Sequence, residues 1–424
     1  MTQTDSESAQ TLASRQRAEI LLRNGRVDEV SDRVNLAIGF HLGSVIQVKT
    51  PEGAVVIDST GGTANAAAAR DALRQRSDQE TRYLVYTHCH PDHCGGGEEL
   101  TSERTEAVVA QSLLPQLWDR DMNCLWPWHR RVRSWQVGFP EEAGGGFPPA
   151  GKFLAPTVTF DETMELVVGD LTVQLEHTQG ETRDHLMVWI PELKVLCPGD
   201  LWYRAFPNLS TPAIGPRPIQ GWIRSLERFI ELEPEYLVPS HTPAVVGREE
   251  VRKVLTDYRD AIAHVWDAST QAMNDGLSVH QAARAIRLPD RLASLPYLAE
   301  AYGTVAWGVR AVYDQLTGWY DGDPANLDPL PRNERDAELV GLAGVDAIVA
   351  RAVQLNNDGE HQLALELLSV VLSAHPLDEA ANRAQIDACR ALVAASPSVN
   401  QRGFYTSGVR AAEARLQKAA DQQA

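Results

Sequence analysis

Four side chains that can bind metal ions follow a run of apolar residues. Residues 83–86, Tyr-Leu-Val-Tyr, have the pattern of a buried strand and lead into Thr87-His88-Cys89-His90-Pro91-Asp92-His93. Imidazole nitrogen and carboxylate oxygen are zinc ligands, and catalytic zinc sites keep a position for water. His88 and His90 leave the strand end pointing the same way and can share one ion, whereas Asp92 and His93 can turn to a second. The spacing therefore predicts a two-metal site.

The elements that must position this cluster are typical of an α/β domain. Short apolar runs alternate with helical patterns up to about residue 260, which is an α/β signature. Two of these runs, residues 54–57 leading into Asp58 and residues 83–86 leading into Thr87, are predicted to be buried strands. Ligands and catalytic groups in α/β sheets lie at the carboxyl ends of strands, so both ends are candidate positions for a site.

The later part of the chain is predicted to be helical. Apolar residues fall at helical spacing over residues 251–272 and 337–395. Residues 357–380 resemble one tetratricopeptide-type helix pair, which cannot bury both of its faces alone and favours packing on neighbouring helices or on a second copy of the chain. Between residues 114 and 156, aromatic, arginine, glycine and proline residues predict a long loop or lid, whose tryptophans are interpreted either as core or as an apolar wall for a substrate.

The composition of the chain limits the kinds of partner that it is expected to bind. The formal net charge is −18, from 39 Lys and Arg against 57 Asp and Glu, and this excess repels nucleic acid. A small anionic substrate is still expected to bind, because metal ions and arginines reverse the potential locally. No stretch approaches the roughly 20 apolar residues of a membrane span, and residues 1–24 lack the apolar run of a signal peptide. Five scattered cysteines suit a reducing cytoplasm, so a cytoplasmic protein is predicted.

The cluster from His88 to His93 resembles the H-x-H-x-D-H signature of the metallo-β-lactamase superfamily. The resemblance implies an αββα sandwich and three further ligands at later strand ends, and the chain has candidates in the expected order: Glu181, with His185 as the alternative, then Asp200, then His241. In the superfamily pattern the position of His185 supports the ligands from the second shell. The implied ligand sets are His88, His90 and Glu181 for one ion and Asp92, His93 and His241 for the other, with Asp200 between them.

A second set of residues resembles the type III, zinc-dependent alkyl sulfatases. Residues 301–331, including Gly318-Trp319-Tyr320-Asp321-Gly322, look like the dimerisation domain of that family. The likeness covers about residues 30–395 and implies two zinc ions and a homodimer formed through the helical half. Asn208 and Arg217 match residues that hold sulfate in the family. The chain departs from the family in having Asp200 where glutamate is typical, in lacking a counterpart of a further arginine, and in lacking the sterol-carrier-like C-terminal domain.

Together these patterns predict a polar tail over residues 1–28, an αββα catalytic domain over 29–250 and an all-helical dimerisation domain over 251–424. The predicted function is hydrolysis of an alkyl sulfate ester by a metal-bound hydroxide, with Asp92 and Asp200 as the catalytic carboxylates. Attack on sulfur and attack on the ester carbon both fit. The alternatives are hydrolysis of another ester, a thioester, a lactone or a phosphoester, and di-iron redox chemistry, because carboxylate-rich sites also accept iron or manganese.

Overall fold

The computed structural model describes residues 24–144, 152–212, 214–215 and 217–423. Most of the predicted N-terminal tail and the glycine- and proline-rich residues 145–151 lie outside this range. The chain divides into two compact units. The first comprises Met1–Trp126 and Pro149–Leu316, and the second comprises Pro127–Pro148 and Thr317–Ala424.

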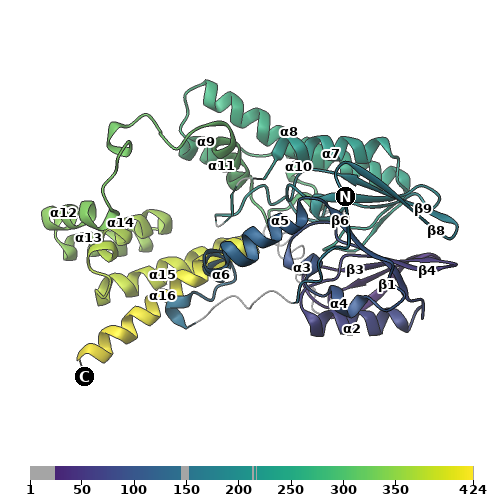
Figure 1. Cartoon of the computed structure of the whole chain (residues 1–424). Helices are drawn as coiled ribbons and strands as arrows, with labels where there is room; N and C mark the ends of the chain where they lie inside the picture. Colours follow the sequence, from purple (N-terminus) through teal and green to yellow (C-terminus); the bar gives the residue numbers. More distant parts are fainter. Residues whose placement is uncertain (1–23, 145–151, 213, 216, 424) are drawn as a thin grey trace, which may run out of the picture. The chain divides into compact units, whose positions relative to one another are not determined.

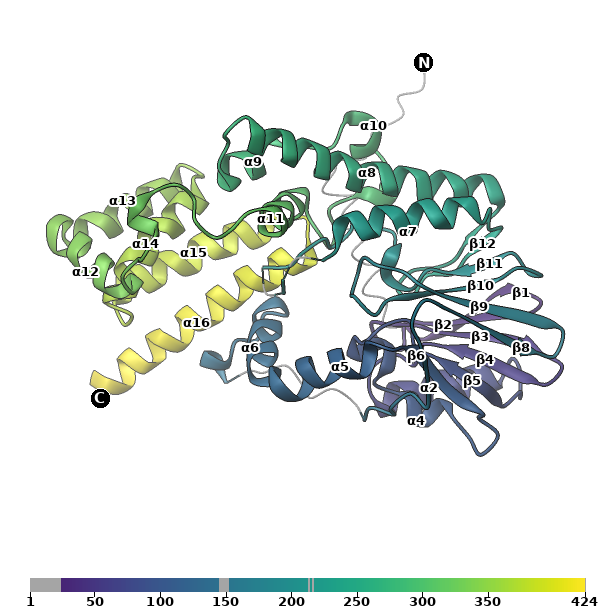
Figure 2. The same cartoon turned by 45° about the horizontal axis from the view of Figure 1, so that its top comes forward.

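The first unit contains an αββα sandwich, as predicted (Figure 1). Figure 2 shows its layers: helices α2 (Thr63–Arg74) and α4 (Gly97–Leu100), two sheets face to face, and helices α7 (Ile219–Glu231) and α8 (Arg248–Asn274) over the second sheet. In the described residues the first sheet has seven strands in chain order: β1 (Arg26–Ser31), β2 (Val34–Ile38), β3 (Val45–Thr50), β4 (Gly53–Ile57), β5 (Thr81–Val85), β6 (Ala107–Gln111) and β7 (Val158–Phe160). The second has six, in the order β13 (Val245–Val246), β12 (Tyr236–Leu237), β11 (Val195–Cys197), β10 (Leu186–Ile190), β9 (Leu171–His177) and β8 (Thr163–Val168).

Strand direction determines where polar side chains gather. Strands β4, β5, β6 and β7 pair in parallel, as do β11 and β12. Central strands such as β2 and β10 are buried along their whole length, as expected for strands covered on both faces. Apolar residues from both sheets form one core cluster between the layers, including Ile57, Val85, Leu175, Val188 and Cys197. This core fixes the strand ends from which the loops of the site emerge.

Helices cover the outer face of the second sheet. Helix α8 is followed by α9 (Val279–Ala285), α10 (Asp290–Ala293) and α11 (Val305–Leu316), and all pack with α7 around a core that includes the fully buried Trp202, Phe206, Trp222 and Tyr258. These helices belong to the first compact unit. The domain boundary predicted after residue 250 falls in the first turn of α8 and stays a prediction.

The second unit is helical. It contains α6 (Trp126–Gln136), α12 (Arg332–Ala343), α13 (Val345–Asn357), α14 (His361–Ala374), α15 (Glu379–Ala395) and α16 (Val399–Gln423). Helix α6 contacts α16, since the Gln136 amide donates to Asn400 and the Ser407 hydroxyl donates to the Trp135 carbonyl. Within the described residues no helix is both long and apolar enough to cross a membrane.

The prediction of a long loop between residues 114 and 156 is wrong for the first half of this segment. Residues 114–136 form α5 (Leu114–Trp118), a π-helical turn η1 (Asp119–Cys124) and α6. Proline at 127 does not oppose a helix because it lies in the first turn, where its missing N–H would have no helical partner. Trp118 stacks on Phe153 at 4.2 Å and is buried, so this tryptophan belongs to the core.

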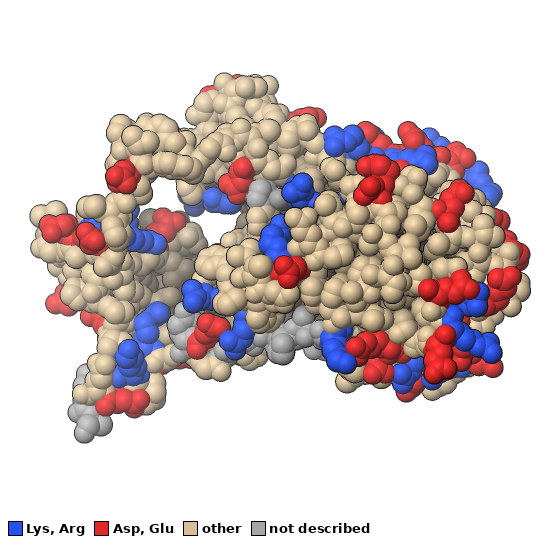
Figure 3. Space-filling view, in the orientation of Figure 1, with Lys and Arg blue, Asp and Glu red and all other residues tan. Residues whose placement is uncertain are grey.

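Charged side chains of both signs mix on the surface. On the face shown in Figure 3, Asp and Glu side chains alternate with Lys and Arg side chains. Several charged residues of the described surface form ion pairs, such as Arg33 with Asp170 and Arg82 with Glu106. This face offers no broad basic patch for a polyanion.

Candidate metal centre

The predicted ligands converge from four strand ends. His88 and His90 follow β5, and Asp92 and His93 lie in the short helix α3 (Pro91–Cys94) that comes next. Glu181 follows β9, Asp200 lies in the turn η3 (Gly199–Leu201) after β11, and His241 follows β12. The structure therefore brings all seven side chains to one edge of the sandwich, although their sequence positions span more than 150 residues.

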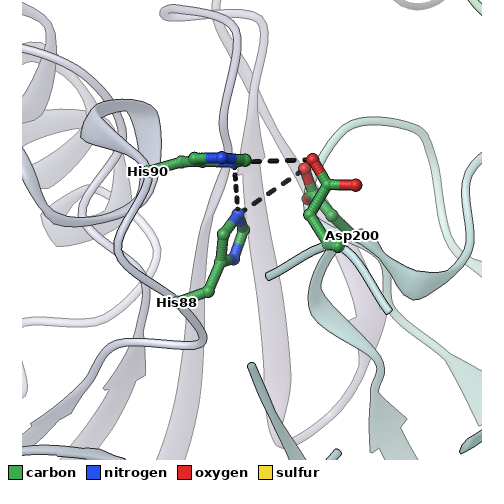
Figure 4. Close-up of side chains that lie close together, drawn as sticks. His88, His90 and Asp200 are labelled. Carbon is green, nitrogen blue, oxygen red and sulfur yellow. Dashed lines mark hydrogen bonds and ion pairs between the residues drawn. The ribbon is translucent and has the colours of Figure 1, made fainter. Parts of the chain in front are cut away.

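The first group of possible ligands is His88, His90, Glu181 and Asp200, whose donor atoms all lie within 4.8 Å of one another. Nε2 of His88 lies 2.9 Å from Nδ1 of His90 and 3.9 Å from a carboxylate oxygen of Asp200. Nδ1 of His90 lies 3.4 Å from Glu181. Figure 4 shows His88 and His90 pointing toward each other and toward Asp200.

The second group is Asp92, His93 and His241. A carboxylate oxygen of Asp92 lies 3.6 Å from Nε2 of His93 and 3.8 Å from Nε2 of His241. Asp200 also faces this group, at 3.4 Å from His93 and 2.8 Å from His241. Asp200 thus lies between the two groups.

Hydrogen bonds behind the ligands orient the imidazole rings. Asp58, at the end of β4, accepts from Nδ1 of His93 at 2.8 Å, from the Thr87 amide and hydroxyl, and from Ser240. Because the Thr87 hydroxyl donates to Asp58, it accepts from Nδ1 of His88. His241 donates Nδ1–H to the Leu42 carbonyl at 2.9 Å. Each of these rings therefore turns its Nε2 toward the site.

His185, the alternative to Glu181, lies outside both groups. Its Nε2 accepts the Asp200 amide at 3.2 Å, and its Nδ1 bonds to the Thr178 hydroxyl at 2.9 Å. Gly199, at φ +55°, makes this contact possible, since a Cβ there would lie 2.8 Å from Cε1 of His185. Burial lowers the pKa of His185 to about 3, so the ring is neutral and accepts. His185 thus supports the turn that carries Asp200.

The donor atoms fit metal ions better than they fit one another. Nε2 of His93 and Oδ1 of Asp200 are buried and have no hydrogen-bond partner among the described residues, although they lie 3.4 Å apart. With Nδ1–H committed to Asp58, Nε2 of a neutral His93 ring would present a lone pair to a carboxylate lone pair. Buried polar atoms without partners are costly, and a cation between them removes that cost. Nitrogen and oxygen donors of this kind suit zinc and other divalent ions.

The electrostatics of the site also favour positive charge. Burial by itself would lower the pKa of His93 and of His241, but the nearby carboxylates, Asp200 first among them, outweigh it. The pKa of His93 consequently lies well above its usual value, and that of His241 rises to about 9. Burial raises the pKa of the Glu181 carboxyl, with Arg217 acting in the opposite direction. A cation would satisfy these carboxylates without a proton.

The two predicted substrate-binding residues lie in the same unit and are buried. Arg217 is 6% exposed and forms an ion pair with Glu181, which belongs to the first group. Asn208 is 1% exposed, and its Oδ1 has no hydrogen-bond partner among the described residues. A buried guanidinium beside the ligands is the kind of group that binds a tetrahedral anion through two oxygens.

Asp58 was noted in the sequence only as the polar residue after a buried strand. The structure makes it the acceptor for His93, so Asp58→Asn is expected to weaken metal binding by about 10- to 100-fold, because the amide cannot hold the ring with the same charge and tautomer. Metal dissociation constants from chelator competition check this. Asp71→Asn is the matched control, since Asp71 is 61% exposed and paired with Arg70. Equal affinity for Asp58→Asn and the control would contradict the assigned role.

Two family descriptions match the chain. Residues 38–241 match the metallo-beta-lactamase superfamily, and residues 278–415 match the alkyl sulfatase dimerisation family. The first match spans every candidate ligand. The second covers α9 to α15 and part of α16.

Similar proteins of known name were found by sequence and by structure. A linear primary-alkylsulfatase from a Pseudomonas species is 30% identical over 390 residues, covering 87% of this chain and 74% of the relative. An (R)-specific secondary-alkylsulfatase from Pseudomonas is 26% identical over 410 residues, covering 90% of this chain and 61% of the relative. Among solved structures, the stereoselective inverting sec-alkylsulfatase Pisa1 from Pseudomonas aligns with a TM-score of 0.87 at 25% identity, over 98% of this chain and 69% of that one.

Proposed function

The chain belongs to the alkyl sulfatase family of the metallo-β-lactamase superfamily, and we propose that it is a hydrolase that cleaves alkyl sulfate esters with the help of two metal ions. The observation that carries the proposal is the pair of ligand groups with Asp200 facing both. The relatives named above act on primary and secondary alkyl sulfates, which supports the same substrate class here.

In this proposal His88, His90 and Glu181 would hold one ion, Asp92, His93 and His241 would hold the other, and Asp200 would be available to both. Bound divalent cations supply Lewis acidity and acidify a coordinated water toward neutral pH. Asp92 and Asp200 serve as the catalytic carboxylates, because their oxygens lie between the imidazoles of the site. Asp58 orients the His93 ring and the Leu42 carbonyl orients the His241 ring, each through Nδ1. His185 accepts the backbone amide of Asp200 and so holds the turn that carries this carboxylate.

The sulfate group is assigned to Arg217 and Asn208. Arg217 brings a buried positive charge to the edge of the first group, where it compensates Glu181. Asn208 adds an amide with donor and acceptor capacity and no charge. Together they offer donors to a sulfate monoanion while the carboxylates remain committed to the cations.

Zinc is the proposed metal, with iron and manganese as alternatives. The groups contain imidazole and carboxylate only. Cys89 and Cys94, which flank the ligands, are buried, and burial raises the pKa of both thiols well above the usual value. Both groups are therefore made of nitrogen and oxygen donors, a set open to zinc and to harder ions.

Activity and metal content test this function together. The purified chain should hydrolyse a linear or secondary alkyl sulfate, lose activity on removal of metal with a chelator, and regain it when zinc is added. A parallel panel of a lactone, a thioester and a phosphate monoester of equal chain length serves as the control. Turnover of one of these, with no release of sulfate from any alkyl sulfate, would replace the proposed substrate class.

We also propose that the protein forms a homodimer through an apolar arm, residues 317–331, between α11 and α12. Every residue from 317 to 335 is exposed, and the arm carries Trp319 and Leu330, which are 74% and 69% exposed, together with Tyr320 and Leu327. Local bonds shape it, since Asp321 accepts from the Asn326 amide and Asp323 caps Ala325. Trp, Tyr and Leu in an ordered exposed segment are typical of an interface, and the arm lies within the dimerisation match.

Introducing negative charge into this arm by mutation is expected to dissociate the dimer. Replacing Trp319 and Leu330 together with aspartate is expected to raise the dimer dissociation constant by at least about 100-fold, because buried anchors of this size are worth 2 kcal/mol or more each. Sedimentation velocity measures the change. Val167→Asp, at an equally exposed residue of β8, should leave the dimer intact. A wild-type monomer, or a double variant that dimerises normally, would contradict the proposal.

A further inference from the structure

A hydrogen bond between the two ends of residues 203–208 closes the loop that carries Asn208. The Asn208 amide donates to the Tyr203 hydroxyl at 2.6 Å. Both residues are buried, with Tyr203 4% and Asn208 1% exposed. Tyr203 comes three residues after Asp200, so one short stretch of chain joins a candidate metal ligand, the tyrosine and the asparagine.

The side chain of Asn208 does not hold itself in place through Oδ1, which has no partner among the described residues. Oδ1 is therefore placed by the backbone of residues 203–208 and not by a bond of its own. Within this stretch, the Tyr203 hydroxyl is the acceptor for the Asn208 amide. Removing the hydroxyl would leave a buried N–H without that partner and free the loop to move.

A second segment, residues 299–303, also contacts this loop. The Phe206 amide donates to the Ala299 carbonyl at 2.9 Å. At Gly303 the backbone lies so near the loop that a Cβ would come within 2.8 Å of Asn208 Cα and closer still to the Pro207 carbonyl oxygen. Real Cβ atoms do not approach backbone this closely, so the contact requires glycine. Residues 299–303 therefore act as a strap over the asparagine.

The ring of Tyr203 links the loop to the metal centre. It lies edge-on to the His241 ring at 6.3 Å and to the Tyr302 ring of the strap at 5.9 Å. Ala205, Ala299 and Ala301 fill the remaining space in this cluster. Edge-to-face packing fixes the ring, and the fixed ring fixes its hydroxyl.

We propose that Tyr203 is a positioning residue for the sulfate-binding Asn208, and that the strap of residues 299–303 holds the loop against it. The inference rests on the proposed function. Tyr203 acts through the backbone of Asn208 and does not itself hold a metal or the substrate. Its loss should impair binding of the anion while leaving both ligand groups intact.

Tyr203→Phe tests this role, because it keeps the ring against His241 and removes only the hydroxyl. The expected result is a KM for an alkyl sulfate, and a dissociation constant for inorganic sulfate, that rise about tenfold, the ratio that corresponds to roughly 1.4 kcal/mol. The value of kcat should stay within about twofold and the metal content should not change. Tyr313→Phe is the matched control, since it also removes the hydroxyl of a buried tyrosine, one that donates to the Leu277 carbonyl and not to the Asn208 loop.

Amide hydrogen exchange separates this inference from the proposed function. In Tyr203→Phe the amide of Asn208 should exchange at least about tenfold faster than in wild type and in Tyr313→Phe, whatever the substrate proves to be. Faster exchange with a raised KM supports the assignment. Unchanged exchange at Asn208, or a fall in kcat with unchanged KM, overturns it. A wild-type protein without sulfatase activity would instead overturn the proposed function, and the exchange rates would still decide the role of Tyr203.

Gly303→Ala probes the strap independently. The added Cβ must displace the loop at Asn208, so sulfate affinity should fall by more than in Tyr203→Phe, again with unchanged metal content. Gly341→Ala, where the new methyl group meets open space, is the control for folding and stability. A folded Gly303→Ala protein that binds sulfate with wild-type affinity would show that residues 299–303 do not position Asn208.

Discussion

Asp200→Ala is expected to reduce turnover by roughly 10³-fold or more and to lower the metal content of both groups. Asp200 lies 3.4 Å from His93, 2.8 Å from His241 and 3.9 Å from His88, so its loss removes an oxygen from each cluster at once. Lewis-acid stabilisation is worth several kcal/mol, and about 1.4 kcal/mol corresponds to a tenfold change in rate. Metal analysis of the purified variant, combined with initial rates on an alkyl sulfate, measures both effects.

Asp170→Ala is the matched control for this experiment. Asp170 is 55% exposed and pairs with Arg33 on the surface, where an ion pair contributes at most about 1 kcal/mol. It should retain full metal content and activity. An Asp200→Ala protein with two bound metals and wild-type turnover would show that Asp200 is not shared between the groups.

Trp222→Ala is expected to lower the free energy of unfolding by about 3–5 kcal/mol. Trp222 on α7 is fully buried, its indole N–H donates to the Leu201 carbonyl at 2.8 Å, and its ring lies so close to Gly180 that a Cβ there would come within 2.8 Å of the indole. Leu201 directly follows Asp200 in the chain, and Gly180 directly precedes Glu181. The truncation therefore leaves a cavity behind the ligand loops, and metal affinity should fall with stability.

Urea unfolding of the metal-free protein isolates the packing effect from the binding effect. Trp128→Ala serves as the control of equal size, since Trp128 is 51% exposed and its loss should cost less than about 1 kcal/mol. Trp222→Phe should lie between wild type and Trp222→Ala, because it keeps one aromatic ring but loses the N–H donor and part of the indole volume. Equal stability of Trp222→Ala and Trp128→Ala would contradict the packing argument.

The cluster from His88 to His93 could be predicted from residue spacing because its signal is local, whereas the sandwich and the three later candidate ligands were implied by the resemblance to the metallo-β-lactamase superfamily. His88 to His93 fall within one turn after a strand, and Glu181, Asp200 and His241 each come shortly after an apolar run. Parallel strands bring their carboxyl ends to one edge, so the pattern already indicates convergence. The metal and substrate roles of these residues stay predictions.

The supporting contacts could not be predicted, because they join residues that are distant in sequence. Asp58 meets His93 and Ser240, and Gly303 meets Asn208, through the packing of whole layers. Composition also led to one wrong prediction of secondary structure. The prolines and glycines after residue 137 made residues 114–136 resemble a loop, whereas proline in the first turn of α6 leaves that helix intact.

Anomalous diffraction from crystals grown with zinc and soaked with inorganic sulfate tests the central claim most directly. The account predicts two anomalous peaks roughly 3.5–4 Å apart, one among His88, His90 and Glu181, the other among Asp92, His93 and His241, with Asp200 between them and sulfate against Arg217 and Asn208. Data collected above and below the zinc edge identify the metal. A single peak outside these side chains, or sulfate bound away from Arg217 and Asn208 in a metal-loaded crystal, would contradict it.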